Sequence, residues 1–475
     1  MALGSAAVSA WPTTAPRAMP SPDGSSRARS KSRRTNIIMV LADDIGYGEI
    51  GCYGQKKIKT PNIDRLAREG LRFTDGYASA SVCAPARASL LTGLHTGHCS
   101  VRRNPGPQGE LPLDPSEATI AEVLKAEGYR TALFGKWGFG QDRGDQPGHP
   151  VSRGFTDFFG YLTHHSAKSY YPRRLWDGRT PITYPGNTGD VGLSYGPDLI
   201  TERALAFLRQ HRDDPFLMML TLPLPHAPSV APNEGRYRDR KNWKPADRIH
   251  AAQISKLDDY VGLVVREVRD LGLDDNTIII FTSDNGAHQE GGVHPSFFDA
   301  SGPYRGIKRN LYEGGIRVPF IAWSPKIMSR TAGKRTAHQT VHYDLMATVT
   351  DFAGVATPTT DGLSLRKVFT GAAGPPKHKY LYWTRLHAGS TPLHLKEDHG
   401  RGRNAAAAVR FGGHWKLVGF APGPEYSAPG KRWRIELYDL RNDPGERHDL
   451  AGDRPKLVRE GLRYLRESWR HPKAP

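Results

Sequence analysis

The chain has 475 residues, 38% hydrophobic and 24% charged, which is typical of a globular protein large enough for more than one domain. Its 66 Lys and Arg residues outnumber its 48 Asp and Glu residues, and the formal charge of +18 favours polyanionic partners. No basic stripe interleaved with aromatic residues and no nucleic-acid-binding motif is present, so we expect no nucleic-acid partner; no apolar run is long enough to span a membrane.

The first 34 residues are rich in Ala, Ser, Pro and Arg and lack the apolar segment of a secretory signal. We expect a disordered tail over residues 1–34, and a cytoplasmic protein unless an N-terminal signal is missing. Three cysteines, Cys52, Cys83 and Cys99, are too few for a disulfide framework, and we expect none to be paired. The oligomeric state is unknown from the sequence.

Strands and helices are predicted to alternate along most of the chain. Continuous apolar runs predict buried strands, and amphipathic periodicity with capping residues predicts helices. In chain order these are strand 36–42, helix 61–69, helix 119–126, strand 129–134, helix 199–210, strand 216–222, helix 248–271, strand 277–282, strand 318–323 and helix 342–353. The alternation predicts an α/β fold with a large, mostly parallel central sheet flanked by helices.

The composition changes after about Gly371, where a Gly/Pro stretch leads into shorter predicted strands. These strands cover 380–383, 406–410, 415–420 and 435–438, and a final helix covers 455–469. We therefore predict an α/β catalytic domain over residues 35–371 and a smaller C-terminal subdomain over 372–475, built from an antiparallel sheet packed with one helix. The Gly- and Pro-rich segments 142–150 and 177–197 are predicted to be surface loops.

Oxygen-rich pairs follow two of the predicted buried strands. Asp43 and Asp44 follow strand 36–42, and Asp284 and Asn285 follow strand 277–282. Ligands of open α/β sheets bind outside the carboxyl ends of the strands, so the two pairs can meet at one site. A single Asp-Asp pair is more often a turn or helix cap; two pairs favour a hard cation, calcium or magnesium.

Cys83 begins the sequence Cys-Ala-Pro-Ala-Arg, in which Pro85 can open a short helix that Gly93 ends. Cys83 would then lie at a helix N-terminus, where amide groups favour anions, with Arg87 one turn further along. The residues alone leave an inert structural cysteine and a thiolate nucleophile open, although the Cys-to-Arg spacing is too short for a cysteine-phosphatase loop.

Cys83-x-Pro-x-Arg87, followed by Ala-Ser-Leu-Leu-Thr-Gly, resembles the signature of the formylglycine-dependent (type I) sulfatases, within the alkaline-phosphatase-like superfamily. Further segments resemble motifs of this family in the same order, across roughly residues 35 to 470. They are Leu41-Ala42-Asp43-Asp44, Gly135-Lys136-Trp137-Gly138, Pro225-His226-Ala227-Pro228, Ser283-Asp284-Asn285-Gly286, Arg305-Gly306-Ile307-Lys308 and the segment from Glu313 to Pro319.

The resemblance implies a sulfuric ester hydrolase whose Cys83 is converted to Cα-formylglycine by a maturation enzyme. It implies that Asp43, Asp44, Asp284 and Asn285 bind calcium together with residue 83. It further implies that Arg87 and Lys136 stabilise the sulfate charge and that His226 and Lys308 protonate the leaving oxygen.

One position departs from the family pattern. Many members have histidine where this chain has Gly138, and we consider His164, His165 or His288 as candidates to replace it. Arg305, in the last lysine motif, is a further candidate for substrate binding.

The predicted substrate is a sulfated saccharide. Besides the basic charge, segments 168–179 and 394–403 combine cationic residues with aromatic or histidine residues, and no apolar hairpin of the kind expected in a steroid sulfatase is present. Two alternatives remain: a phosphonate or phosphodiester hydrolase on the same scaffold, and a non-catalytic binder of sulfated glycans.

Overall fold

The computed structural model describes residues 34–106, 109–386 and 389–471. The predicted tail over 1–34 therefore lies outside the described residues except for its last residue. The central feature is a sheet whose ten strands run in the order β11-β2-β10-β9-β1-β8-β4-β5-β6-β7. In that order the strands span Lys334–Thr336, Leu71–Phe73, Phe320–Trp323, Thr277–Ser283, Asn36–Ala42, Phe216–Thr221, Arg130–Lys136, Asp157–Tyr161, Arg174–Asp177 and Thr180–Thr183.

The middle of this sheet is parallel. Strands β9, β1, β8, β4 and β5 pair in parallel, while β10 runs antiparallel to β9, and β6 and β7 are antiparallel at one edge. All seven residues of β1 are buried, because helices cover both faces of the sheet. The predicted fold class is confirmed.

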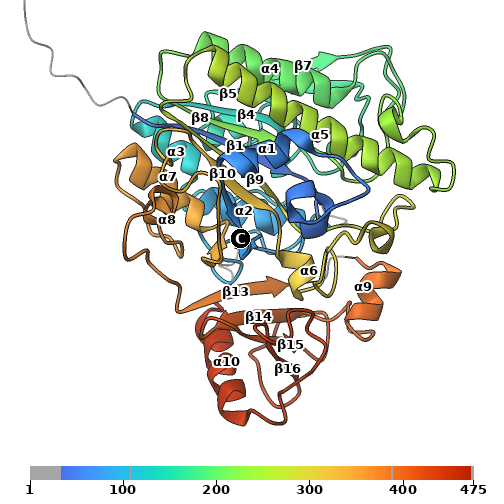
Figure 1. The fold of residues 1–475 in the computed structure, drawn as a ribbon, viewed down its shortest axis with the longest axis vertical. Coiled ribbons are helices and arrows are strands. Elements are labelled where there is room, and N and C mark those ends of the chain that lie inside the picture. Colours follow the sequence, from blue (N-terminus) through green and yellow to red (C-terminus); the bar gives the residue numbers. More distant parts are fainter. Residues whose placement is uncertain (1–33, 107–108, 387–388, 472–475) are drawn as a thin grey trace, which may run out of the picture. The chain divides into compact units, whose positions relative to one another are not determined.

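Helices form a layer on each side of the sheet (Figure 1). Ile38 and Val40 of β1 pack with α1 (Pro61–Glu69), α4 (Gly196–Gln210) and α5 (Pro245–Asp270). The alternate residues Met39 and Leu41 pack with α2 (Cys83–Thr92), α3 (Ile120–Ala126), α7 (Asp344–Ala353) and α8 (Arg366–Thr370). The period-2 alternation of a strand thus divides the apolar run of β1 between two cores.

The second sheet is antiparallel and has the order β13-β14-β15-β16. Its strands span Tyr380–Arg385, Ala406–Phe411, Trp415–Phe420 and Arg434–Asp439, and α10 (Pro455–Glu467) packs against β14 and β15 (Figure 1). The short elements are β3 (Gly76–Tyr77), β12 (Thr340–Val341), α6 (Glu313–Ile316) and α9 (Pro392–Glu397). Residues 34–475 group into one unit, so the small sheet packs directly on the rest.

The sequence missed several short elements. Strand β5 was not predicted, and the β6–β7 hairpin overlaps the predicted loop 177–197. These strands are only four or five residues long and carry no long apolar run, which is why periodicity does not detect them. Cys52, Cys83 and Cys99 are unpaired as expected, and none of the helices in the described residues is long and apolar enough to cross a membrane.

Candidate functional site

The predicted metal residues meet where β1 and β9 end. The two strands pair over their whole length, which brings Ala42 opposite Ser283. The Asp44 backbone N–H donates to Asp284 Oδ1 at 3.1 Å, and the Asp284 N–H donates to Ala42 O at 3.1 Å. Asp44 has a φ of 75°, a left-handed conformation that Asp tolerates better than most residues. Pairing of the strands therefore fixes the predicted oxygen ligands at one edge of the sheet.

Three buried cations neutralise three buried carboxylates here. Lys136 Nζ lies 2.7 Å from Asp43, Lys308 Nζ lies 2.6 Å from Asp44, and Arg87 Nε lies 2.9 Å from Asp284. Arg87 also contacts Asp43 at 3.4 Å. We call these six residues the site charge cluster. Its cations come from the end of β4 (Lys136), from α2 (Arg87) and from the loop before α6 (Lys308).

The cations and carboxylates shift one another's pKa values. Burial opposes ionisation of Asp43, but the charges of Lys136 and Arg87 outweigh it and hold the pKa of Asp43 well below its usual range. Burial and the neighbouring Asp43 raise the pKa of Asp284 to about 7. Even with three cations in the cluster, the neighbouring carboxylates therefore disfavour ionisation of Asp284, and a further cation bound here would stabilise its ionised form.

Cys83 is the first residue of α2, as the sequence predicted. Its Sγ lies 3.5 Å from Asp43 Oδ1 and 3.9 Å from Asp44 Oδ1, and the residue is 1% exposed. Burial raises the pKa of the Cys83 thiol well above its ordinary value. The unmodified side chain is therefore a poor thiolate nucleophile, which weakens the alternative in which the thiolate itself attacks.

The donor set of this site fits a hard cation. Asn285 Nδ2 donates to Asp44 Oδ1 at 2.7 Å, whereas Asn285 Oδ1 is buried and has no hydrogen-bond partner among the described residues. A buried amide oxygen without a donor is costly unless something binds it. Carboxylates and an amide oxygen are ligands that calcium and magnesium prefer, and zinc would call for more nitrogen or sulfur ligands.

His226 lies beside the same carboxylates. Its Nδ1 contacts the carbonyl of Ala227, and its Nε2 lies 3.6 Å from Asp44 Oδ2. Burial, with help from the charge of Lys308, lowers the pKa of His226 to about 4. Because Nδ1–H donates to a carbonyl, Nε2 of the neutral ring carries the lone pair.

His288 contacts the loop that carries His226. Its Nε2 donates to Pro225 O at 3.2 Å, and its Nδ1 accepts the Glu290 N–H at 3.1 Å. His288 is 1% exposed, and it is not one of the residues that line the cavity described next. Its contacts assign it a positioning role.

A cavity of about 920 Å³ opens onto the charge cluster. Cys83, Lys136, His226 and Lys308 line it, together with His164 and His165 from the predicted candidates. The remaining lining residues are Asn104, Pro105, Gly106, Gly109, Glu110, Gly140, Gln141, Asp142, Thr163, Ser166, Lys168, Ala227, Pro228, Glu290, Gly291 and Arg309. No Phe, Tyr, Trp, Leu, Ile, Val or Met is among the described lining residues, so the lining lacks large apolar side chains and contains several cations.

Several lining residues were not predicted from the sequence. Asn104 Oδ1 accepts the N–H of Ala84 at 2.9 Å, and Arg309 pairs with Glu290 at 2.5 Å. Glu110 binds His164. They lie in irregular loops without a motif, and no pattern in a single sequence identifies them.

Three of the expected substrate contacts lie wholly or partly apart from the 920 Å³ cavity. Arg305 stacks on Tyr312 and donates to Tyr438 at 3.1 Å, away from the cavity, because it joins the loop before α6 to the small sheet. In segment 168–179, Tyr170 and Trp176 are buried in the cores, and only Lys168 lines the 920 Å³ cavity. In segment 394–403, His394 is buried against Asp398 at 3.2 Å.

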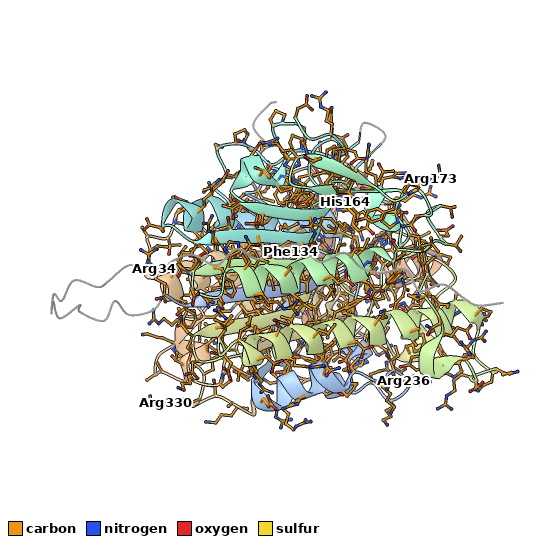
Figure 2. The ribbon with its side chains drawn as sticks, turned by 90° about the horizontal axis from the view of Figure 1, so that it is seen from above. Arg34, Phe134, His164, Arg173, Arg236 and Arg330 are labelled. Carbon is orange, nitrogen blue, oxygen red and sulfur yellow. The ribbon has the colours of Figure 1, made fainter. Side chains whose placement is uncertain are left out.

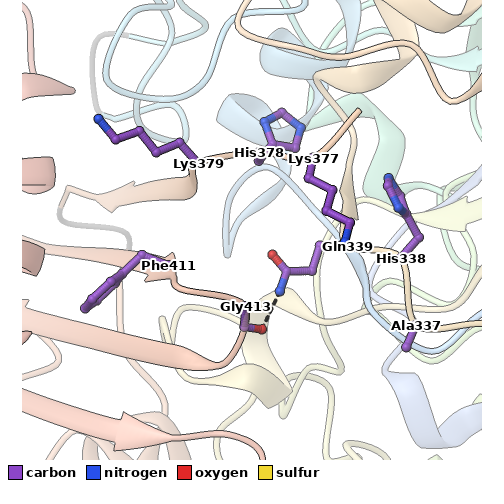
Figure 3. A pocket seen from close by; sticks show the side chains of 8 residues that line it. All are labelled: Ala337, His338, Gln339, Lys377, His378, Lys379, Phe411 and Gly413. Atoms are coloured by element: carbon purple, nitrogen blue, oxygen red, sulfur yellow. Dashed lines mark hydrogen bonds between the residues drawn. The ribbon is translucent and has the colours of Figure 1, made fainter. Parts of the chain in front are cut away.

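A second cavity of about 300 Å³ lies beside the small sheet (Figure 3). Its lining residues are Ala337, His338, Gln339, Lys377, His378, Lys379, Phe411 and Gly413. His378 is bound to Asp344 at 2.7 Å, and Gln339 donates to Gly413 O. None of the predicted site residues lines this cavity.

The family model of the sulfatases matches residues 35–355, which is most of the chain. The chain belongs to the sulfatase family. Arylsulfatase A of Homo sapiens is 31% identical over 468 residues, covering 92% of this chain and 87% of that protein. N-acetylgalactosamine-6-O-sulfatase of Bacteroides thetaiotaomicron is 28% identical and covers 92% of this chain and 93% of its own length.

A solved structure gives the same result for the fold of this sulfatase. The crystal structure of Ps i-CgsB in complex with k-i-k-neocarrahexaose has a TM-score of 0.77 and 25% identity, covering 93% of this chain and 94% of that one. The formylglycine-type sulfatase family inferred from the sequence is thereby confirmed.

Proposed function

We propose that this sulfatase hydrolyses sulfate esters of an anionic saccharide, with residue 83 as the nucleophile and a calcium ion in the site. The observation that carries the proposal is that Cys83 contacts the carboxylates of the site charge cluster and lines one cavity together with two of its cations, Lys136 and Lys308. Family membership makes a sulfuric ester hydrolase the expected class of enzyme. Magnesium is the alternative cation.

Two groups absent from the unmodified chain complete the site. Oxidation of Cys83 to Cα-formylglycine would supply a hydrated aldehyde, one hydroxyl of which attacks sulfur. Calcium, held by Asp43, Asp44, Asp284 and Asn285, would supply positive charge for the sulfate oxygens. The unpartnered Oδ1 of Asn285 supports this assignment.

The cations of the cluster are placed to stabilise charge. Arg87 and Lys136 are buried and fixed by contacts to Asp284 and Asp43, so they need no reorganisation when negative charge develops on the sulfuryl group. The N-terminus of α2 adds the positive end of its helix dipole at the same position. Together they favour binding and reaction of a sulfate ester over a neutral ester.

The geometry favours Lys308 over His226 as the donor to the leaving oxygen. The ammonium of Lys308 carries three N–H groups, and both residues line the cavity. Nε2 of His226 can donate only from the imidazolium, since Nδ1–H is engaged with Ala227 O. We assign Lys308 the proton transfer and His226 a contact to the same oxygen.

The lining supports a saccharide rather than a steroid or other apolar substrate. A steroid needs apolar walls. The walls here lack large apolar side chains and contain Lys168, His165 and Arg309 in the same cavity as residue 83. Hydroxyl groups and further sulfates of a glycan match such donors.

Turnover of a panel of sulfated mono- and oligosaccharides, aryl and steroid sulfates and a phosphonate monoester tests the proposal, with residue 83 identified by peptide mass. We expect the sulfated saccharides to be turned over with the highest kcat/KM, and affinity for multiply sulfated ones to fall with added salt. A preference for the steroid or the phosphonate ester would overturn the substrate or the reaction class, respectively. Binding without turnover, when residue 83 is formylglycine, would favour the non-catalytic alternative.

A further inference from the structure

The space beside Gly138 is filled by another side chain. Gly138 follows the end of β4 and has a φ of 91°, which L side chains rarely adopt. A Cβ at this position would lie 2.5 Å from Cε1 of His164 and 3.2 Å from its Nε2. The imidazole of His164 (labelled in Figure 2) therefore occupies the volume into which a side chain of residue 138 would project.

Glu110 holds this ring at Nδ1. Its Oε2 lies 2.7 Å from His164 Nδ1, and its Oε1 accepts the backbone N–H of His164 at 2.6 Å. Two bonds from one carboxylate to one residue fix both the backbone and the ring. With the carboxylate accepting from Nδ1–H, the lone pair of the neutral ring lies on Nε2.

Nε2 of His164 has no hydrogen-bond partner in the part of the chain that the structure describes. The atom is buried, and no described residue lies within hydrogen-bond distance of it. His164 is 9% exposed and lines the same cavity as Cys83 and Lys136. Burial, with the charges of Lys136 and Arg87, keeps the pKa of His164 well below its ordinary value, so the resting ring is neutral.

We propose that His164, oriented by Glu110, is the base that takes a proton from the hydroxyl group that attacks sulfur, a role that rests on the proposed sulfatase function. The attacking oxygen forms its bond to sulfur, its O–H electron pair stays on oxygen, and the proton moves to Nε2. The imidazolium is stabilised by the Glu110 carboxylate at Nδ1, as in other His–carboxylate pairs. As this bond forms, the ester S–O bond breaks and its electron pair leaves on the alcohol oxygen, which takes a proton from Lys308, so one proton is removed and one is delivered in this transfer of the sulfuryl group.

Histidine at position 164 should be needed for chemistry more than for substrate binding. We expect His164→Ala to lower kcat by about 10²–10³-fold with KM changed less than about threefold, as for loss of a general base. The variant opens a space the size of the lost ring, so added imidazole should restore part of kcat. Glu110→Gln should lower kcat by a smaller factor, since the amide keeps a contact to the ring without stabilising the imidazolium.

His149 provides the matched control. It is also buried with an unpartnered Nε2, but it does not line the cavity. His149→Ala should show no rescue by imidazole. A His164→Ala enzyme that is folded and loses no kcat, or that loses it without rescue while Glu110→Gln stays fully active, overturns the proposal.

A measurement without turnover separates this proposal from the function itself. In protein with ¹⁵N-labelled histidine, the His164 ring should be the neutral Nδ1–H tautomer, and inorganic sulfate should shift Nε2. Glu110→Gln should change the tautomer ratio. If the wild-type protein hydrolyses no sulfate ester, the proposed sulfatase function is wrong, and the tautomer of His164 can still be measured. If His164 is the Nε2–H tautomer and sulfate does not shift its Nε2 signal, only the proposed role of His164 is contradicted.

Discussion

Two buried clusters of charge, each of three carboxylates and three cations, lie in this protein. One is the site charge cluster. The other, which we call the junction cluster, consists of Asp75, Glu313, Arg317, Arg410, Lys416 and Glu446. It joins the segment after β2 and the helix α6 to strands β14 and β15 of the small sheet. Composition and burial alone do not distinguish the two.

The surroundings of the two clusters distinguish them. Lys416 lies 2.9 Å from both Glu313 and Glu446, Tyr77 donates to Glu313 at 2.7 Å, and no member of the junction cluster lines the 920 Å³ cavity. The site charge cluster borders that cavity and the unpartnered Oδ1 of Asn285. In this protein the functional site is marked by buried charge that borders a large cavity, whereas the charge of the junction cluster does not border it.

Cys83→Ala should show the largest effect on the site side of this comparison. It removes the proposed nucleophile without removing a cluster charge, so turnover should fall by at least about 10³-fold while Tm stays near that of the wild type. Cys83→Ser should be nearly as inactive unless the maturation enzyme accepts serine. Rates with a saccharide sulfate and thermal unfolding measure both, and full activity of Cys83→Ala would contradict the mechanism.

Lys308→Ala should lose about 10²–10⁴-fold in kcat on saccharide sulfates, whose alkoxide leaving group needs a proton. On an activated aryl sulfate the loss should be much smaller. His226→Ala should show the same trend more weakly. Rates over a series of leaving groups test this; equal losses on all of them would mean that both residues only bind sulfate.

Lys416→Met should lower the stability of the protein and leave turnover unchanged, the reverse of what we expect for Cys83→Ala. It leaves Glu313 and Glu446 buried without their ammonium, which typically destabilises by about 3–5 kcal/mol. Folded protein should retain its kcat. Denaturant unfolding, with activity normalised to folded protein, separates the effects; a loss of kcat without a loss of stability would place the junction cluster in the mechanism.

Metal removal should act on the site charge cluster alone. A cation that binds only the folded state stabilises by about 2.7 kcal/mol at a hundredfold excess over its Kd, so a chelator should lower Tm and abolish turnover, and calcium should restore both. Elemental analysis identifies the ion. Stoichiometric zinc with neither calcium nor magnesium would refute the assignment.

Glu446→Gln should have the smallest effect and a pH-dependent sign. Burial raises the pKa of Glu446 to about 7, above its ordinary value of 4.5. Protonated Glu446 contributes to the stability of the wild type at low pH, and this contribution is lost as the pH rises from about 4.5 to 7. The glutamine variant does not ionise, so its Tm relative to wild type should rise over that window, on the order of 1–3 °C. A constant difference in Tm across the window would contradict the shift.

The sequence predicted the residues of the site better than their surroundings. Asp43 and Asp284 follow long apolar runs that predict strands. The ends of neighbouring parallel strands lie at the same edge of the sheet, so these residues come together regardless of the loop conformations. Tyr170 and Trp176 look like exposed sugar-binding residues in the sequence but are buried. Loop conformation decides that difference, and a single sequence carries no periodic signal for it.

The same limit applies to Gly138. In the sequence motif, Gly138 indicates that the histidine of many family members is missing. In the structure, the ring of His164 fills the volume of that side chain. His164 fills this volume because it follows β5, which pairs with the strand that Gly138 follows. The spacing of the two residues along the chain does not show that they are close. The junction cluster, formed from residues 75 to 446, was missed for the same reason.

The pairing of β1 with β9 also constrains how the protein folds. The bond from Asp44 to Asp284 joins residues 240 positions apart, and closing such a loop is slow compared with forming a helix or hairpin. We therefore expect the oxygen ligands to come together only when the central sheet is complete. Partly folded chains would have no cation site, so calcium in the refolding buffer should slow unfolding of the finished protein without accelerating its refolding.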